Sequence, residues 1–118
     1  MGNMIHWEND YAAALRKAKA ENKPVFLSFF SPDSASCRLM DAVTYTKKEV
    51  VSFLNKFVVS VRVPVDAKPL ANDLDVHSAP VCLIVDWKGA EHVRTVGFRP
   101  PKEFLCSILA VVAKIYMM

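Results

Sequence analysis

The chain has 118 residues, of which 53% are hydrophobic and 23% are charged. This length and composition are typical of one compact domain, residues 1–118, and exclude a long disordered or low-complexity segment. The net charge of +3 comes from scattered basic residues that are not interleaved with aromatic ones, so we expect no nucleic-acid partner.

The ends of the chain and its cysteines limit which classes of protein, such as secreted, membrane-spanning or metal-binding ones, the sequence favours. The start MGNMIHWEND lacks the regions of a signal peptide, and the apolar end FLCSILAVVAKIYMM is too short for a membrane span. The cysteines, Cys37, Cys82 and Cys106, leave at least one free thiol in a monomer, which favours a reducing compartment such as the cytoplasm. Because they show no zinc-type spacing with the histidines, we expect no metal and no cofactor.

Helices and strands alternate along the predicted fold. Residues 8–22 combine alanine and charge at helical spacing, which predicts a helix, and the apolar run 23–30 predicts a strand covered on both faces. Next come a helix from about 34 to 55 that bends near 44–46, a strand at 56–65, a loop or brief helix at 68–76, a hairpin of strands at 79–86 and 90–98, and a helix at 99–116. This order predicts an α/β fold, a three-layer α/β/α sandwich with a mixed central sheet.

The segment SPDSASC, residues 31–37, lies where the first apolar strand gives way to a helix. Ser31, Pro32 and Asp33 are typical of a helix start: a capping hydroxyl, a proline with a helical φ, and an acid at the positive end of the helix dipole. Ser34 is the alternative cap. Either choice places Cys37 in the first or second turn.

The element order, with a thiol at a strand-to-helix turn and an X-Pro before a later apolar strand, resembles the thioredoxin fold. The resemblance is closest to small thioredoxin-related and disulfide-isomerase-like domains, and it extends from Trp7 to about Leu109. It is carried by ALRKAKAENKPVFLSFF, SASCRLM, VVSFLNKFVVSVRVPVD and DVHSAPVCLIVDWKGAEHVRTVGFRPPKEFL. It implies a thioredoxin-like sandwich and a protein or peptide partner with a thiol or disulfide.

Members of that family carry a Cys-x-x-Cys pair, in which the first cysteine attacks a substrate disulfide and the second resolves the mixed disulfide. Ser34 matches the first position of the pair and Cys37 the second. A serine hydroxyl is too weak an acid and too poor a leaving group to replace the attacking thiol. Ser34 and Cys37 are therefore the candidate catalytic residues of a degenerate site that supports at most single-thiol mixed-disulfide chemistry.

The resemblance also implies a docking edge. Pro80 matches the family's cis-proline, which lies beside the active-site helix. The cis form is tolerated at this position because an X-Pro bond has only a small preference for trans. The backbone of Ala79 is then available to pair with an extended peptide. Thioredoxins proper bury a carboxylate in the preceding strand, six residues before the first cysteine, whereas this chain has Ser28 there.

Three charged or titratable residues are candidates for the surroundings of Cys37. Asp33 stands where relatives often have an aromatic residue, and its negative charge would raise the pKa of a nearby thiol. Arg38 would offset this effect, unless its side chain points into water. His77 precedes Pro80 by three residues and either accepts a proton at the rim of Cys37 or lies exposed in a loop.

Three functional hypotheses remain open. The first is a thioredoxin-like domain with single-thiol chemistry through Cys37 and peptide docking beside Pro80. The second is a redox-silent protein-interaction module. The third is a dithiol oxidoreductase whose first cysteine was engineered to Ser34.

The final helix is more apolar than a single covering face requires. One predicted stripe comprises Phe104, Ile108, Val111 and Ile115, and the adjacent one Leu105, Leu109, Val112 and Tyr116. The helix at 102–116 is thus either a deeply packed terminal helix or the contact surface for a dimer or another partner.

Overall fold

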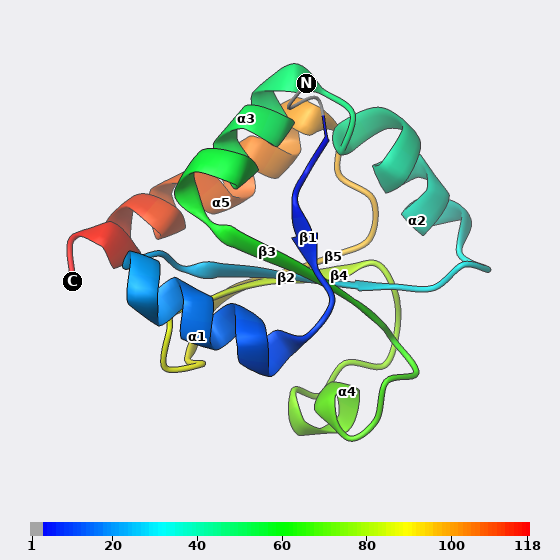
Figure 1. The fold of residues 1–118 in the computed structure, drawn as a ribbon. Coiled ribbons are helices and arrows are strands. Elements are labelled where there is room, and N and C mark those ends of the chain that lie inside the picture. Colours follow the sequence, from blue (N-terminus) through cyan, green and yellow to red (C-terminus); the bar gives the residue numbers. More distant parts are fainter. Residues whose placement is uncertain (1–3) are drawn as a thin grey trace.

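The fold of residues 4–118, given by a computed structural model, is a five-stranded mixed sheet between two layers of helices (Figure 1). Its strands are β1 (Trp7–Glu8), β2 (Val25–Phe30), β3 (Val59–Pro64), β4 (Val81–Val85) and β5 (Glu91–Val96), in the spatial order β1-β3-β2-β4-β5. The first three run parallel, whereas β4 is antiparallel to β2 and β5 is antiparallel to β4. The predicted three-layer sandwich with a mixed sheet is confirmed.

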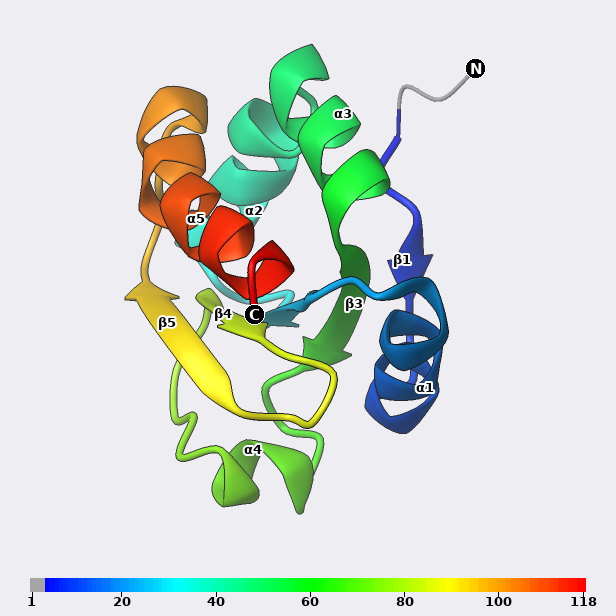
Figure 2. The same ribbon diagram turned by 90° about the vertical axis from the view of Figure 1, so that its left-hand side faces the viewer.

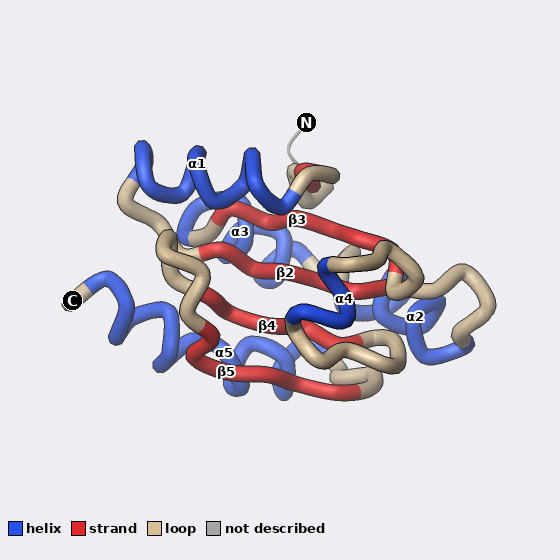
Figure 3. Tube along the Cα trace, turned by 90° about the horizontal axis from the view of Figure 1, so that it is seen from below, coloured by secondary structure: helices blue, strands red, loops and turns tan. Residues whose placement is uncertain are grey.

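Helices cover both faces of the sheet. One layer contains α2 (Ala35–Leu39), the π-helical turn η1 (Met40–Thr44), α3 (Lys48–Phe57) and α5 (Pro101–Tyr116) (Figure 2). The opposite face carries α1 (Tyr11–Glu21) and α4 (Leu70–Asp73), which lie in front of the sheet in Figure 3. The brief helix predicted within 68–76 is α4.

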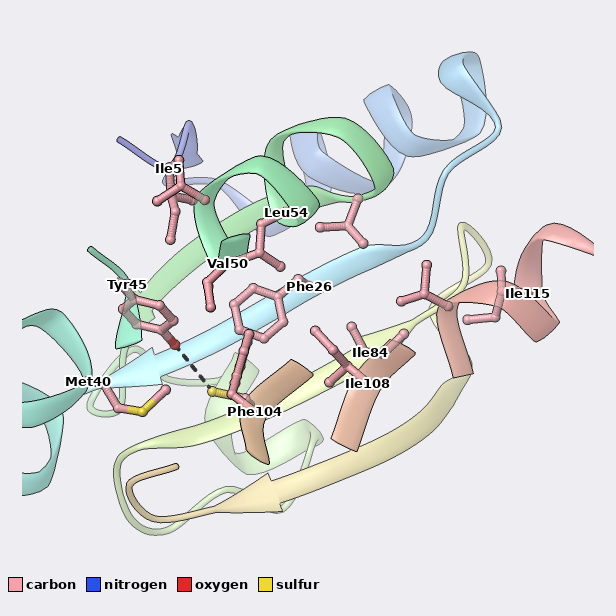
Figure 4. Packing of buried hydrophobic residues seen from close by; sticks show 14 residues of the cluster. Ile5, Phe26, Met40, Tyr45, Val50, Leu54, Ile84, Phe104, Ile108 and Ile115 are labelled. Atoms are coloured by element: carbon pink, nitrogen blue, oxygen red, sulfur yellow. Dashed lines mark hydrogen bonds between the residues drawn. The ribbon is translucent and has the colours of Figure 1, made fainter. Parts of the chain in front are cut away.

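The core divides into two clusters because neighbouring residues of a strand point to opposite faces of the sheet. Phe26 faces α3 and α5, where its ring meets that of Phe104 edge-on with the centroids 5.5 Å apart (Figure 4). Leu27 belongs to the second cluster, which α1 and α4 cover. The central strand β2 is therefore covered on both faces, as its continuous apolar sequence predicts.

Two predicted elements differ from the structure. The prediction that residues 8–22 form one helix is wrong at its start, because Trp7 and Glu8 form an edge strand that pairs with Ser60 and Val61 before α1 begins. A strand of this length is too short to leave an alternating pattern.

The single helix predicted from about 34 to 55 is wrong in extent. The chain passes from α2 into η1 and leaves the helical conformation at 45–47, close to the predicted bend, before α3 continues to Phe57. The break accompanies the burial of Tyr45, whose ring packs edge-on against those of Phe26 and Phe104. The next strand consequently begins at Val59 rather than at residue 56.

Candidate functional site

The site begins where β2 ends and α2 starts. Of the two predicted caps, Ser34 is the N-cap, and its Oγ accepts a hydrogen bond from the backbone N–H of Cys37 at 3.2 Å. The Ser31 hydroxyl instead accepts a bond from the Asp33 amide at 3.4 Å. Asp33 therefore lies in the exposed turn before the helix and not in its first turn.

Ser34 also contacts the loop before β4. Its hydroxyl donates a hydrogen bond to the carbonyl oxygen of Ala79 at 3.2 Å, and the Ala79–Pro80 peptide bond is cis, as predicted. Pro80 is buried, and its carbonyl oxygen accepts a bond from the Gly97 amide at 2.9 Å. The cis-proline loop is thus held by α2 on one side and by the end of β5 on the other.

The Ala79 amide is the remaining polar group of this loop. It donates no hydrogen bond within residues 4–118, and Ala79 is partly exposed. Its carbonyl oxygen has two lone pairs, of which Ser34 uses one. Ala79 consequently presents both a donor and an acceptor to an incoming extended chain.

Cys37 lies under the turn formed by residues 31–34. Only 4% of its surface is exposed, and its Sγ accepts a hydrogen bond from the Ser31 amide at 3.5 Å. All three cysteines are free thiols, with Cys37 and Cys82 buried and Cys106 exposed on α5. A substrate disulfide therefore reaches the Cys37 sulfur only after a local movement of the 31–34 turn.

A buried polar cluster, formed by Ser28, Tyr45 and Cys82, lies in the neighbouring core. The Tyr45 hydroxyl lies 3.1 Å from Ser28 Oγ and 3.5 Å from Cys82 Sγ, the contact dashed in Figure 4. Burial raises the pKa of the Cys82 thiol and raises that of Tyr45 well above its ordinary value. The cluster is thus uncharged at neutral pH.

The sequence contains only part of the signal for this cluster. The sequence places Ser28, a polar residue, at the position where thioredoxins bury a carboxylate, and Cys82 within the apolar run of a later strand. They are register partners on β2 and β4. Nothing in the local pattern indicates that Tyr45 reaches them, because the contact crosses 17 residues of sequence to Ser28 and 37 to Cys82.

The charged candidates lie around the rim. The Arg38 guanidinium donates a hydrogen bond to the Pro32 carbonyl oxygen at 3.0 Å. The Arg38 side chain therefore lies back over the 31–34 turn. His77 is exposed and its Nε2 lies 2.5 Å from an Asp75 carboxylate oxygen, and no hydrogen bond joins it to Cys37 within the part of the chain that the structure describes. The structure thus brings Ser34 and Ala79 together and leaves His77 outside this contact.

A hollow of about 420 Å³ borders the other side of the 31–34 turn. Its walls come from the ends of β2 and β3 and the segments after them: Phe30, Ser31, Pro32, Asp33, Pro64, Val65 and Asp66. In residues 4–118, no group of three or more histidine, cysteine or acidic side chains could hold a metal ion. No helix in the same range is long and apolar enough to cross a membrane.

Comparisons with known proteins agree with this architecture. Residues 1–97 match the profile of a family described as Thioredox_DsbH, protein of unknown function, DUF255. The solution structure of a thioredoxin from Thermus thermophilus is similar with a TM-score of 0.83 and 28% sequence identity, over 93% of this chain and 88% of that one. No match was found among curated proteins.

Two other solved structures resemble this chain and carry oxidoreductase names. The first, named DsbH Oxidoreductase, has a TM-score of 0.81 and 20% identity over 93% of this chain and 85% of its own. The second is the oxidised C-terminal domain of DsbD from Neisseria meningitidis, with a TM-score of 0.70 and 25% identity over 85% of this chain and 94% of its own.

Proposed function

The chain belongs to the Thioredox_DsbH family, and we propose that residues 1–118 act as one docking domain with a degenerate Ser34-x-x-Cys37 site. Its fold is thioredoxin-like and related to that of thiol–disulfide oxidoreductases. On this proposal the domain binds an extended segment of a protein or peptide beside Ala79 and Pro80. Thiol exchange through Cys37 is slow and secondary.

The observation that carries the proposal is the position of Ser34. A hydroxyl, not a thiol, caps α2 and contacts the Ala79 carbonyl at 3.2 Å. Because disulfide exchange requires a thiolate, this position cannot attack a disulfide. The free Ala79 amide beside it can still bind a carbonyl oxygen of an extended chain, so the docking function does not depend on the missing thiol.

The chemistry left to Cys37 is a single exchange. Its thiolate attacks one sulfur of a substrate disulfide, a new Cys37–substrate disulfide forms, and the other substrate sulfur leaves as a thiolate that takes up a proton. No cysteine at position 34 can then attack the mixed disulfide, so release requires an external thiol. With 4% of Cys37 exposed, the first attack is slow as well.

The burial of Cys37 also favours a second candidate function, a redox-silent interaction module. On that reading Cys37 is a small core residue whose sulfur accepts the Ser31 amide, and only docking remains. We propose a protein or peptide as the partner in both cases, with α5 as a further contact surface for a dimer or another partner.

The rate of Cys37 modification separates the two candidates. We would follow alkylation of Cys37 by peptide mapping between pH 6 and 10, in the native protein and in urea, and incubate the native protein with insulin as a protein disulfide. Slow native alkylation, together with a mixed disulfide that persists until an external thiol is added, supports single-thiol exchange. A Cys37 thiol that is inert until denaturation rejects this chemistry and leaves the redox-silent module.

The Ser34→Cys variant tests the third hypothesis. If the fold retains dithiol chemistry, this variant forms a 34–37 disulfide and turns over insulin with an external reductant, whereas the original chain does not. Turnover in the variant would favour a serine that replaced a cysteine. The control variant Ser36→Cys carries an additional thiol on the same helix at a position outside the Cys-x-x-Cys spacing, and we expect no turnover from it.

A further inference from the structure

The 31–34 turn lies between the docking edge at Ala79 and the hollow of about 420 Å³. Ser34 contacts Ala79 on one side of the turn, and residues 31–33 line the hollow on the other. The strand order agrees, because β2 lies between β4, which follows Ala79, and β3, whose end borders the hollow (Figure 3). Neighbouring strands are about 4.8 Å apart, so the two places are separated by about 10 Å, or about three residues of an extended chain.

The walls of the hollow are largely apolar. Phe30 ends β2, and its register partner Pro64 ends β3. Val65 follows, and its amide donates a hydrogen bond to the Phe30 carbonyl oxygen at 2.8 Å, which holds the two strand ends together. Phe30 and Val65 are both partly exposed, so the hollow can pack against the hydrocarbon part of a side chain.

The hollow offers few hydrogen-bond donors. The amides of Ser31, Asp33 and Val65 all donate bonds within the fold. The two prolines of the lining, Pro32 and Pro64, have no N–H to donate. A ligand in the hollow therefore meets mainly acceptors.

Two of these acceptors are carboxylates. Asp33 and Asp66 both line the hollow and are both exposed. Neither forms an ion pair within residues 4–118. The hollow is thus an apolar surface with two negative charges at its rim.

The cations nearest in the chain do not neutralise this rim. Arg62 pairs with Asp41 at 2.8 Å, and the Lys68 ammonium donates a hydrogen bond to Asn72. Arg38 is bound to the backbone of the 31–34 turn and offsets at most one of the two negative charges. A ligand that supplies a further positive charge is therefore favoured.

We propose that the hollow binds an arginine or lysine side chain of the docked partner, about three residues from the partner residue that bonds to Ala79. These two side chains combine an apolar stem for the walls with a cationic donor for the carboxylates. The inference rests on the proposed docking at Ala79 and adds the class of segment that docks there, an extended basic one. Because the whole chain carries a net charge of +3, its overall field would favour an acidic segment, so a basic preference must come from the hollow.

The test is a nuclear magnetic resonance titration of the ¹⁵N-labelled full chain with acetylated nine-residue peptides. The host peptide alternates serine and valine, so it can shift in register, and its central residue is arginine, lysine, norleucine or glutamate. The Ala79 amide signal reports docking and the Asp66 amide signal reports the hollow. The arginine and lysine peptides should bind about threefold or more tighter than the norleucine peptide and about tenfold or more tighter than the glutamate peptide.

Charge-removing variants test which carboxylates are responsible. Asp33→Asn and Asp66→Asn should each reduce the preference for arginine over norleucine by about twofold, and the double variant should abolish it. Glu21→Gln is the matched control, since it removes an exposed carboxylate at the end of α1, next to the start of β2 and hence at the opposite edge of the sheet. This control should keep the full preference, and circular dichroism checks that each variant is folded.

Failure of this inference and failure of the docking function give different results. Peptides that shift the Ala79 signal with equal affinity, whatever their central residue, would leave docking intact and overturn the basic preference. A preference that Glu21→Gln reduces as much as Asp66→Asn would also overturn it, because the hollow would not be its source. If no peptide shifts the Ala79 signal at about 1 mM, the range of very weak association, the docking function itself fails and this inference fails with it.

Discussion

The Ser34 hydroxyl donates a hydrogen bond to the carbonyl oxygen of Ala79 and accepts one from the Cys37 amide, each at 3.2 Å. One side chain therefore joins the start of α2 to the cis-proline loop, which lies 45 residues further along the chain. A thiol at the same position would be a weaker partner for both groups, because an S–H is a poor donor and sulfur a weak acceptor. Ser34 thus contributes two hydrogen bonds to this corner that a cysteine would form only weakly.

Replacing this serine should reduce the stability of the fold. Ser34→Ala removes the N-cap and the bond to Ala79, and we expect a loss of about 1–2 kcal/mol in the free energy of unfolding, measured by urea denaturation. Ser36→Ala is the matched control, because the Ser36 side chain makes no hydrogen bond within residues 4–118 and should change stability by no more than about 0.5 kcal/mol. Equal losses in the two variants would contradict a capping role for Ser34.

The three cysteines should react in a fixed order with an alkylating reagent. Cys106 is exposed and should be modified first, followed by Cys37, which the 31–34 turn covers. Cys82 should be modified last, about 100-fold or more slower than Cys106, because burial both shields its sulfur and raises its pKa. Time-resolved mass spectrometry of the intact protein and its peptides gives the order, and modification of Cys82 in the folded protein at the rate of Cys106 would contradict it.

Local patterns predicted most of the fold because each long element has its own periodicity. The continuous apolar runs of β2 and β4 and the more alternating sequence of β5 are visible without tertiary information. The edge strand at Trp7 is not visible in this way, because it depends on pairing with residues distant in sequence. Near 44–46 the sequence predicts a bend, but it does not predict that the chain leaves the helical conformation there, where Tyr45 packs against distant aromatic rings. Long-range packing overrides local propensity at these two places.

The sequence predicts only those residues of the candidate site that belong to a family motif. The spacing of Ser34 and Cys37, and the proline at position 80, were found from the sequence through the resemblance to thioredoxins. The bond between Ser34 and Ala79 was not, because no pattern records which carbonyl a hydroxyl reaches across the fold. The sequence does not indicate whether Cys37 is accessible, because a helix start gives the position of a residue but not what covers it.

The Tyr45 hydroxyl should contribute to stability in a pH-dependent way. Tyr45→Phe leaves Ser28 and Cys82 without this partner, and we expect a loss of about 1–2 kcal/mol near pH 7 in urea denaturation. Tyr11→Phe is the control, since the Tyr11 hydroxyl makes no hydrogen bond in residues 4–118. A loss in Tyr45→Phe no larger than that of the control would contradict the prediction.

The high-pH behaviour follows from the raised pKa of Tyr45, which burial causes first and the neighbouring Cys82 second. Above the ordinary tyrosine pKa of 10.0, the unfolded chain loses this proton and the folded chain keeps it. The unfolded state then binds fewer protons, so stability falls as the pH rises above about 10. The fall should be shallower in Tyr45→Phe, and ultraviolet titration should detect ionisation of Tyr45 only as the protein unfolds.

The turn between β4 and β5 should determine part of the free energy of unfolding at acidic pH. Asp86 is buried, its Oδ1 accepts the amides of Lys88 and Ala90 at 2.9 and 3.0 Å, and its Oδ2 lies 3.0 Å from His92 Nε2. Burial alone would raise the pKa of this carboxyl group, but the hydrogen bonds from His92, Ala90 and Lys88 together outweigh burial and lower it below 3.8. Asp86 is therefore an ionised group that the fold stabilises.

Asp86→Asn should cost about 1–3 kcal/mol at neutral pH, because it removes the charge from three hydrogen bonds. Between the ordinary pKa of Asp86 and its lower value in the fold, the unfolded state binds the extra proton, so the contribution is present above about pH 4 and is lost as the pH falls. The difference in unfolding free energy between the original chain and the variant should thus narrow from pH 6 towards pH 2. Glu91→Gln, which removes a partly exposed ion pair with Arg94 in the same hairpin, should cost no more than about 1 kcal/mol. A constant difference for Asp86→Asn across this range would show that the charge of Asp86 contributes nothing and that only its shape matters.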